Sequence, residues 1–251
     1  MEVCVDSIES ALAAWRGGAA RLELCSSLSE GGLTPSIGLL KCLKSDKYAH
    51  FGRRTVFCLI RPRGGDFLYS EDEVEVMVED VEALGAAGAD GFVFGALTKE
   101  GDVDELSCAK VIAACKGKPM TFHRAIDMSR DLLQAARTIS DLGFSRILTS
   151  GGQRSALEGK TTLKKLVEVS KKVTVMPGGG ISEVNLEELL RETGCREFHA
   201  SAREKAASRM EFRNEACSMG TESAEYSVLV TSEVKVKRMV KIFEDFTSTG
   251  N

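Results

Sequence analysis

Reactive side chains alternate with apolar ones in four short segments of the chain. Cysteine, glutamate, threonine and histidine occupy every second position within residues 1–5, 22–25, 120–123 and 197–201. A β-strand sends successive side chains to opposite faces, so the reactive residues of each segment share one face. Parallel strands covered by helices are normally apolar on both faces. We therefore expect these polar faces to point into a functional site.

Two cysteines, Cys4 and Cys25, end the first and second of these segments. Neighbouring strands lie about 4.8 Å apart in a sheet, so two sulfur atoms at equivalent heights can bridge one ion. Thiolate sulfur is a preferred ligand of Cu(I). The alternative is that both are small core residues, because free cysteine is among the most buried residue types. We interpret the other six as core or surface thiols: Cys42, Cys58, Cys108, Cys115, Cys195 and Cys217.

Histidines and charged residues stand at or just after the ends of other apolar runs: His123, His199, Arg61, Arg124 and Asp127. A histidine held by acidic neighbours can act as a general acid or base, and arginine binds carboxylate or phosphate through paired hydrogen bonds. The alternative is a buried polar network that only fixes the shape of the fold, with Glu23 paired to Arg61. We expect the histidines to be functional.

Glycine-rich segments follow two later apolar runs, at Gly151 and at Gly178, Gly179 and Gly180. Backbone N–H groups in such loops, together with a nearby helix N-terminus, can bind phosphate. Further residues are candidates for the same anion site: Arg63, Ser201 and Arg203. The alternative is that these glycines serve only to make tight turns.

Eight apolar runs predict the strands that must position these residues. They lie near residues 1–5, 21–25, 55–60, 91–95, 119–123, 146–149, 173–176 and 197–200. Helical patterns fill the gaps, with Asp6 as the expected cap of the first helix and Ser70 and Glu73 as a capping box. Eight strand–helix units in about 250 residues are typical of a (β/α)₈ TIM barrel. A doubly wound open sheet is the alternative, and it usually needs fewer strands.

The whole chain, residues 1–251, is predicted to form one barrel domain. In the tail, residues 202–251, a short strand is expected at 228–230 and a helix from Ser232 that closes the barrel as its eighth. Active sites of such barrels lie at the C-terminal ends of the strands. All candidate residues above follow strand ends, so we expect them at one rim.

Composition excludes several other classes of protein. A formal charge of -4 and a pI near 5.6 argue against a nucleic-acid partner. No apolar run approaches the roughly 18 residues of a membrane-spanning helix, and the N-terminus enters a strand without a secretion signal. The eight cysteines are then expected to be reduced thiols of a cytoplasmic protein. Motifs for a nucleophile elbow, a zinc protease or dinucleotide binding are not found.

Seven segments resemble one known family in order along the chain: MEVCVDS, RLELC followed by EGGLTPS, IRPRGGDF, TFHRAID, ILTSG, VMPGGGI and EFHASAR. Together they resemble the CutC family of copper homeostasis proteins, from the first residue to about Asn214. The resemblance implies a cytoplasmic (β/α)₈ barrel, with a nuclear location left open, that assembles into a homo-oligomer. It also implies Cu(I) binding by the residues that match Cys4 and Cys25. Ala20 departs from the family pattern, which usually has aspartate there, and this puts a local salt bridge in doubt.

Two functions remain in view. The first is copper homeostasis, with Cu(I) as the bound ion and Cys4 and Cys25 as its ligands. The second is an enzyme that acts on a small anionic metabolite, including phosphorylated ones. In that case His123 and His199 are the acid–base groups and three arginines are the clamps: Arg61, Arg63 and Arg124. Both functions use the same rim.

Overall fold

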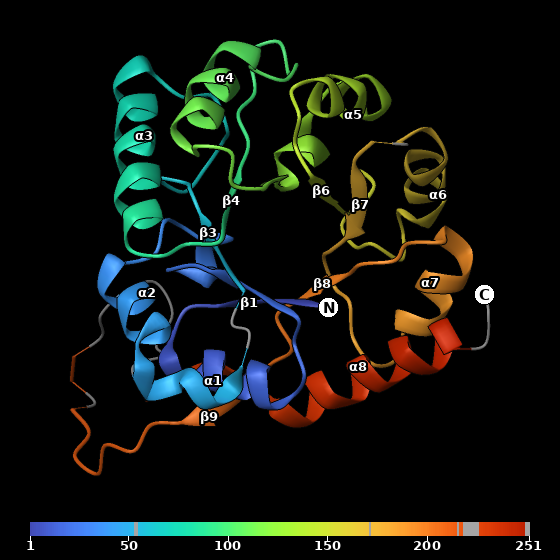
Figure 1. The fold of residues 1–251 in the computed structure, drawn as a ribbon. Helices are drawn as coiled ribbons and strands as arrows, with labels where there is room; N and C mark the ends of the chain where they lie inside the picture. The colour runs from blue at the N-terminus through green and yellow to red at the C-terminus, as the bar shows by residue number, and fades with distance from the viewer. Residues whose placement is uncertain (53–54, 171, 215, 218–225, 249–251) are drawn as a thin grey trace.

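Eight parallel strands form the centre of the molecule (Figure 1). The computed structural model describes residues 1–52, 55–170, 172–214, 216–217 and 226–248. Its strands are β1 (Glu2–Val5), β2 (Arg21–Leu24), β3 (Val56–Leu59), β4 (Gly91–Phe94), β5 (Met120–Phe122), β6 (Arg146–Thr149), β7 (Thr174–Pro177) and β8 (His199–Ala200). They pair in the order β7-β6-β5-β4-β3-β2-β1-β8. Each of the eight lies where an apolar run predicted it.

Helices alternate with the strands and surround them (Figure 1). They are α1 (Ile8–Arg16), α2 (Ile37–Lys44), α3 (Glu71–Ala86), α4 (Glu105–Ala114), α5 (Leu132–Asp141), α6 (Lys160–Val169), α7 (Leu186–Thr193) and α8 (Glu233–Ser248). A short 3-10 helix, Arg124–Met128, follows β5. In the part of the chain that the structure describes, no helix is long and apolar enough to cross a membrane. The eight parallel strands that alternate with helices confirm the (β/α)₈ architecture.

Helix caps account for where two of these helices begin. The capping box at α3 is confirmed, because Ser70 Oγ accepts from the Glu73 amide while the Glu73 carboxylate accepts from the Ser70 amide. The expectation for α1 was wrong by one residue. Ser7, not Asp6, is extended just before the helix, and its Oγ accepts from Ser10 N at 3.2 Å.

The ring of strands is nearly closed. Strands β7 and β8 stand at the two ends of the hydrogen-bonded order, and no ladder joins them among the described residues. β8 has only two residues, and both pair with β1, Glu2 opposite His199 and Val3 opposite Ala200. This places the β8 side chains directly beside those of β1.

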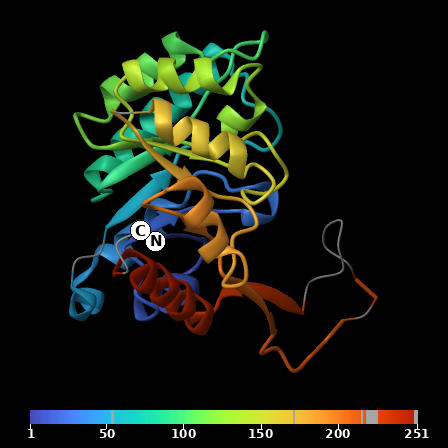
Figure 2. The same ribbon diagram turned by 90° about the vertical axis from the view of Figure 1, so that its right-hand side faces the viewer.

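The tail adds a second sheet outside the barrel. β9 (Arg203–Ala207) and β10 (Ser227–Thr231) pair as an antiparallel ribbon that extends from the body of the molecule (Figure 2). The strand expected at 228–230 lies within β10, whereas β9 is polar and exposed and gave no strand signal. α8 then packs against α7 and against α1, which is the first helix of the barrel (Figure 1).

Alternate residues of the strands pack into two different clusters. Val3, Val5, Leu22 and Leu24 belong to the large core that the helices cover. The opposite face of the first four strands supplies a small second cluster, which consists of Cys4, Cys25, Phe57, Leu59 and Val93. The period-two alternation of the sequence thus separates the helix-facing core from the face that carries the reactive residues.

Candidate functional site

A cavity of about 390 Å³ lies at the C-terminal ends of the strands. Its lining combines ionisable and apolar side chains, among them Cys4, Glu23, Glu30, Arg61, Phe67, His123, Arg124, Asp127, Leu148, His199 and Arg203. A larger cavity, about 650 Å³, lies at the other end and is lined by residues at strand beginnings such as Arg21 and Arg146. In this fold chemistry belongs to the C-terminal end, so the smaller cavity is the candidate site.

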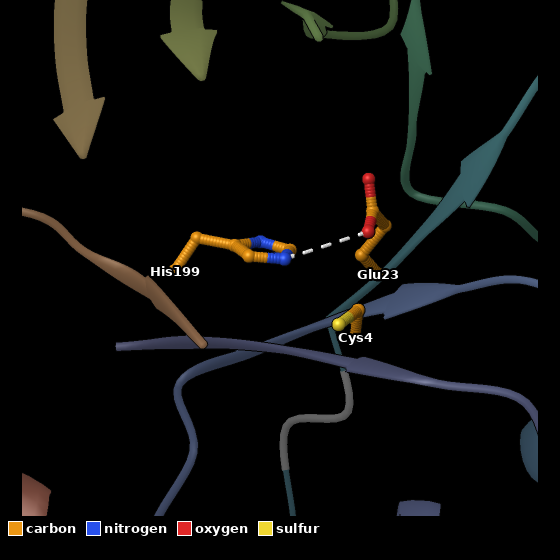
Figure 3. Close-up of side chains that lie close together, drawn as sticks. All are labelled: Cys4, Glu23 and His199. Atoms are coloured by element: carbon orange, nitrogen blue, oxygen red, sulfur yellow. Dashed lines mark ion pairs between the residues drawn. The ribbon is translucent and has the colours of Figure 1, made fainter. Parts of the chain in front are cut away.

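Cys4, Glu23 and His199 converge from three neighbouring strands on one side of this cavity (Figure 3). Strand register brings them together, because Cys4 pairs with Glu23 and Glu2 pairs with His199. One ligand atom from each of the three lies within 4.8 Å of the others. Among the residues that the structure describes, this is the one group of three or more side chains able to hold a metal ion.

His199 lies between two carboxyl groups. Its Nδ1 is 2.7 Å from Glu2 Oε1, and its Nε2 is 3.7 Å from Glu23 Oε2. Burial lowers the pKa of His199, but electrostatic interactions with Cys4 and Glu23 and a hydrogen bond to Glu2 outweigh it and raise the pKa well above 6.5. The ring is thus held as an imidazolium.

The two carboxyl groups beside His199 have opposite pKa shifts. For Glu2 burial raises the pKa, yet the hydrogen bond to His199 and the charge of Arg21 prevail and lower the pKa to about 2. For Glu23 burial dominates and raises the pKa. Glu2 is therefore the fixed counter-charge of His199, whereas burial makes the ionisation of Glu23 less favourable.

The two candidate copper ligands differ in their access to the cavity. Cys4 is 8% exposed and lines the cavity, whereas Cys25 is fully buried behind it. The Cys25 sulfur lies 3.5 Å from Glu23 Oε2. Burial and the neighbouring Glu23 carboxylate raise the pKa of the Cys25 thiol well above 9, so Cys25 carries its proton. Cys4 and Cys25 belong to one cluster, with Glu23 beside both.

The remaining six cysteines lie outside the candidate site. Cys58, Cys108, Cys115 and Cys195 are buried, and burial raises the pKa of each thiol to about 11 or 12. Cys42 is half-buried and Cys217 is exposed, and all eight thiols are free. This agrees with their interpretation as core or surface thiols.

Arg61 and His123 form another part of the cavity wall, after β3 and β5. Arg61 Nη1 donates to the carbonyls of Glu30 and Gly32, at 2.8 and 3.0 Å, and Nη2 donates to that of Gly65 at 2.9 Å. The alternative pairing of Arg61 with Glu23 is not formed, because Glu23 lies beside His199. His123 is packed against Phe67, with ring centroids 5.0 Å apart.

Asp127, in the 3-10 helix after β5, reaches with its side chain the loop that follows β6. Its carboxylate accepts from the backbone amides of Ser150 and Gly152 at about 3.0 Å and from Thr149 Oγ1 at 2.5 Å. Arg124 Nε donates to the same carboxylate at 2.8 Å. In the first glycine-rich segment, the amides of Ser150 and Gly152 are therefore already bound to a carboxylate of the chain itself.

The other residues proposed to bind an anion are dispersed. Arg63 donates to Glu73 Oε1 at 2.5 Å and lies over the start of α3, away from the cavity. A Cβ atom on Gly178 would be 2.5 Å from Leu148, so this glycine allows close packing behind His199. Gly179 lies beside the Arg124 guanidinium, and Gly151 faces the backbone of Gly159. Further along, the Ser201 carbonyl accepts from Thr231 Oγ1, and Arg203 lines the cavity.

Three residues of the site were not assigned a role from the sequence: Glu2, Glu23 as a partner of His199, and Phe67. Glu2 and Glu23 were visible as members of the polar strand faces. Their pairing with His199 depends on the register between β1, β2 and β8, which joins the beginning of the chain to residue 199. Phe67 stands in a loop and carries no periodic signal.

Comparison with known proteins identifies the family of this chain. The CutC family model matches residues 1–204. The copper homeostasis protein cutC homolog of Mus musculus is 50% identical over 248 residues, which cover 98% of this chain and 89% of the mouse protein. The homolog of Homo sapiens is 51% identical over 242 residues, which cover 95% of this chain and 87% of the human one.

Solved structures extend the comparison to the fold. A CutC protein from Streptococcus agalactiae superimposes with a TM-score of 0.75 and 31% identity, covering 80% of this chain and 97% of that one. The deoxyribose phosphate aldolase of Aeropyrum pernix gives a TM-score of 0.59 at 14% identity, over 80% of this chain and 84% of the aldolase, and shows the fold alone. By its family match and these relatives, the chain belongs to the CutC family and is a homolog of copper homeostasis proteins.

Proposed function

We propose that this protein binds Cu(I) at the rim of the barrel through Cys4, with Cys25 and His199 as the further ligands. The observation that carries the proposal is the convergence of Cys4, Glu23 and His199 within 4.8 Å in the cavity. Cys4 is the anchoring ligand because it joins this group and also lines the cavity.

The chemistry of the donors fits copper. Cysteine sulfur is the soft ligand that Cu(I) prefers, and imidazole nitrogen also binds copper well. Glutamate oxygen suits harder ions, so Glu23 is better placed as a proton acceptor than as a ligand. Glu23 lies between the Cys25 thiol, at 3.5 Å, and His199 Nε2, at 3.7 Å.

Ligation must displace protons. The Cys25 thiol and the His199 imidazolium both hold a proton in the metal-free protein, because the pKa of each is raised. A metal ion binds only the deprotonated forms. The affinity for Cu(I) is therefore expected to increase as pH rises.

Competition for Cu(I) against a chromophoric chelator, under anaerobic and reducing conditions, tests the proposal. Cys4→Ser should abolish most high-affinity binding, whereas Cys25→Ser and His199→Asn should each weaken it. Cys108→Ser, a buried thiol in α4, is the matched control and should bind as the parent does. If Cys4→Ser competes for Cu(I) as well as the parent, the proposed site is wrong.

We also propose the cytoplasmic location and the self-association that the family resemblance implies. Exposed apolar side chains support self-association, since Phe212 is 76% and Met210 is 60% exposed beside the β9–β10 ribbon. Light scattering coupled to size-exclusion chromatography measures the assembly directly. A molar mass equal to the 27.1 kDa of one chain would contradict it.

A further inference from the structure

Arg61 is a buried cation without an anionic partner. It is 6% exposed, and its guanidinium donates to three backbone carbonyls. Within the described ranges no carboxylate lies at ion-pair distance from it. Its buried Nε–H finds no hydrogen-bond partner in the described part of the chain. Because burying an unpaired charge is costly, the cavity beside Arg61 is expected to favour a negatively charged occupant.

His123 supplies an unused donor in the same wall. The ring is 5% exposed, and its Nδ1 accepts from the Ala125 amide at 3.2 Å. The proton of the neutral ring must then reside on Nε2, which finds no hydrogen-bond partner in the described part of the chain. Burial, and next the charge of Arg61, lower the pKa of His123 to about 3, so the ring stays neutral at working pH. His123 Nε2 is thus a hydrogen-bond donor without an acceptor in the described part of the chain.

Arg203 is a further positively charged residue in the lining of the same cavity. It follows β8, lines the cavity and is half-buried. Its guanidinium makes no ion pair with any residue that the structure describes. Arg124 differs, because Asp127 and Ser150 already bind its guanidinium. Donors without a partner in the described part of the chain therefore lie at Arg61 and His123, with the Arg203 guanidinium in the same cavity lining, and not at the amides that Asp127 binds.

We propose that Arg61, His123 and Arg203 bind the carboxylate or phosphate group of a small organic molecule whose other end lies against Cys4, Glu23 and His199. The cavity of about 390 Å³ lies at the small end of the range for metabolite sites. An occupant would supply the counter-charge that Arg61 lacks and the acceptor that His123 Nε2 lacks. The proposal goes beyond copper binding and needs no copper.

Ligand-observed NMR on the copper-free protein tests it. The probes are inorganic phosphate and pyruvate. Each is titrated at constant ionic strength, with chloride as the balancing anion. Arg203→Gln removes a charge at the rim without touching the barrel core. His123→Asn removes the Nε2 donor but keeps an oxygen that can accept from the Ala125 amide. Arg137→Gln, an exposed arginine on α5, is the matched control.

The parent is expected to bind at least one probe. Its preference between the two probes shows whether the site favours a phosphate or a carboxylate group. Arg203→Gln and His123→Asn should each weaken that binding about tenfold or more, whereas Arg137→Gln should bind as the parent does. Absence of binding to the parent, or equal binding by parent and both site variants, would overturn the proposal. An equal loss of affinity in Arg137→Gln would also overturn the proposal, because it would indicate general attraction between the probe and positive charge. Since the copper-free protein is used, neither result depends on the copper proposal.

Discussion

At the scale of single residues, the site is organised by pairs of ionisable groups with opposite roles. His199 is held positive by Glu2 and its acidic neighbours, whereas His123 is held neutral by burial and by Arg61. The sequence predicted that both histidines reach the rim, and the structure places both in the cavity lining. It could not predict their charge states, because these depend on neighbours brought in from other strands.

The neutral state of His123 gives a prediction for stability. The pKa of His123 falls from 6.5 to about 3 on folding, so below pH 6.5 the unfolded chain takes up a proton that the folded chain refuses. Stability from this residue is complete above pH 6.5 and is lost as pH falls toward 3. At pH 4 the loss amounts to about 3 kcal/mol.

Urea unfolding of the parent and of His123→Asn at pH 7 and pH 4 measures this effect. Any advantage of the parent over the variant should shrink by about 3 kcal/mol at the lower pH. The matched control is His50→Asn, which removes an exposed imidazole. An unchanged difference between parent and His123→Asn at the two pH values would show that His123 does not resist protonation.

Asp127 gives a second prediction at this scale. Its carboxylate is 6% exposed and accepts from two backbone amides, so Asp127→Ala leaves buried donors without acceptors. The free energy of unfolding should fall by about 3 kcal/mol or more. Denaturant titration measures it, with exposed Asp141→Ala at the end of α5 as control. A loss below about 1 kcal/mol would mean that the loop does not depend on this carboxylate.

At the scale of elements, period-two and helical patterns predicted all eight barrel strands and the C-terminal helix. The first cap was placed one residue early, because Asp6 and Ser7 both suit a cap and only the backbone angles of Ser7 decide. β9 was missed for another reason. Its sequence REKAA lies exposed in a two-stranded ribbon, so no buried face imposes an alternation of apolar residues.

Two glycines test how the elements pack. A Cβ atom on Gly91, at the start of β4, would lie 2.5 Å from the Pro119 carbonyl and 2.6 Å from the Phe57 ring. A Cβ atom on Gly38, in α2, would meet only Ser36 Oγ, at 4.0 Å. Gly91→Ala should therefore destabilise the protein strongly, whereas Gly38→Ala should stabilise it by about 0.5–1 kcal/mol. Thermal unfolding of the two variants measures both changes in stability. Equal changes in Gly91→Ala and Gly38→Ala would contradict this packing.

At the scale of the whole molecule, the count of strand–helix units was enough to predict the fold. The nearly closed ring was not predictable, because it follows from the two-residue length of β8 and its pairing with β1 alone. The cavity depends on the same closure. The pairing of β8 with β1 brings residue 199 beside residues 4 and 23, so Cys4, Glu23 and His199 form a group only in the folded barrel.

In the proposed copper site, Cu(I) is held by the sulfurs of Cys4 and Cys25 and by the imidazole of His199. X-ray absorption at the copper edge of the Cu(I)-loaded protein tests it most directly, because the signal distinguishes sulfur from nitrogen or oxygen ligands. We expect two sulfur atoms and one nitrogen in the parent, and one sulfur fewer in Cys25→Ser. A spectrum with only nitrogen and oxygen ligands, or one unchanged in Cys25→Ser, would contradict the claim.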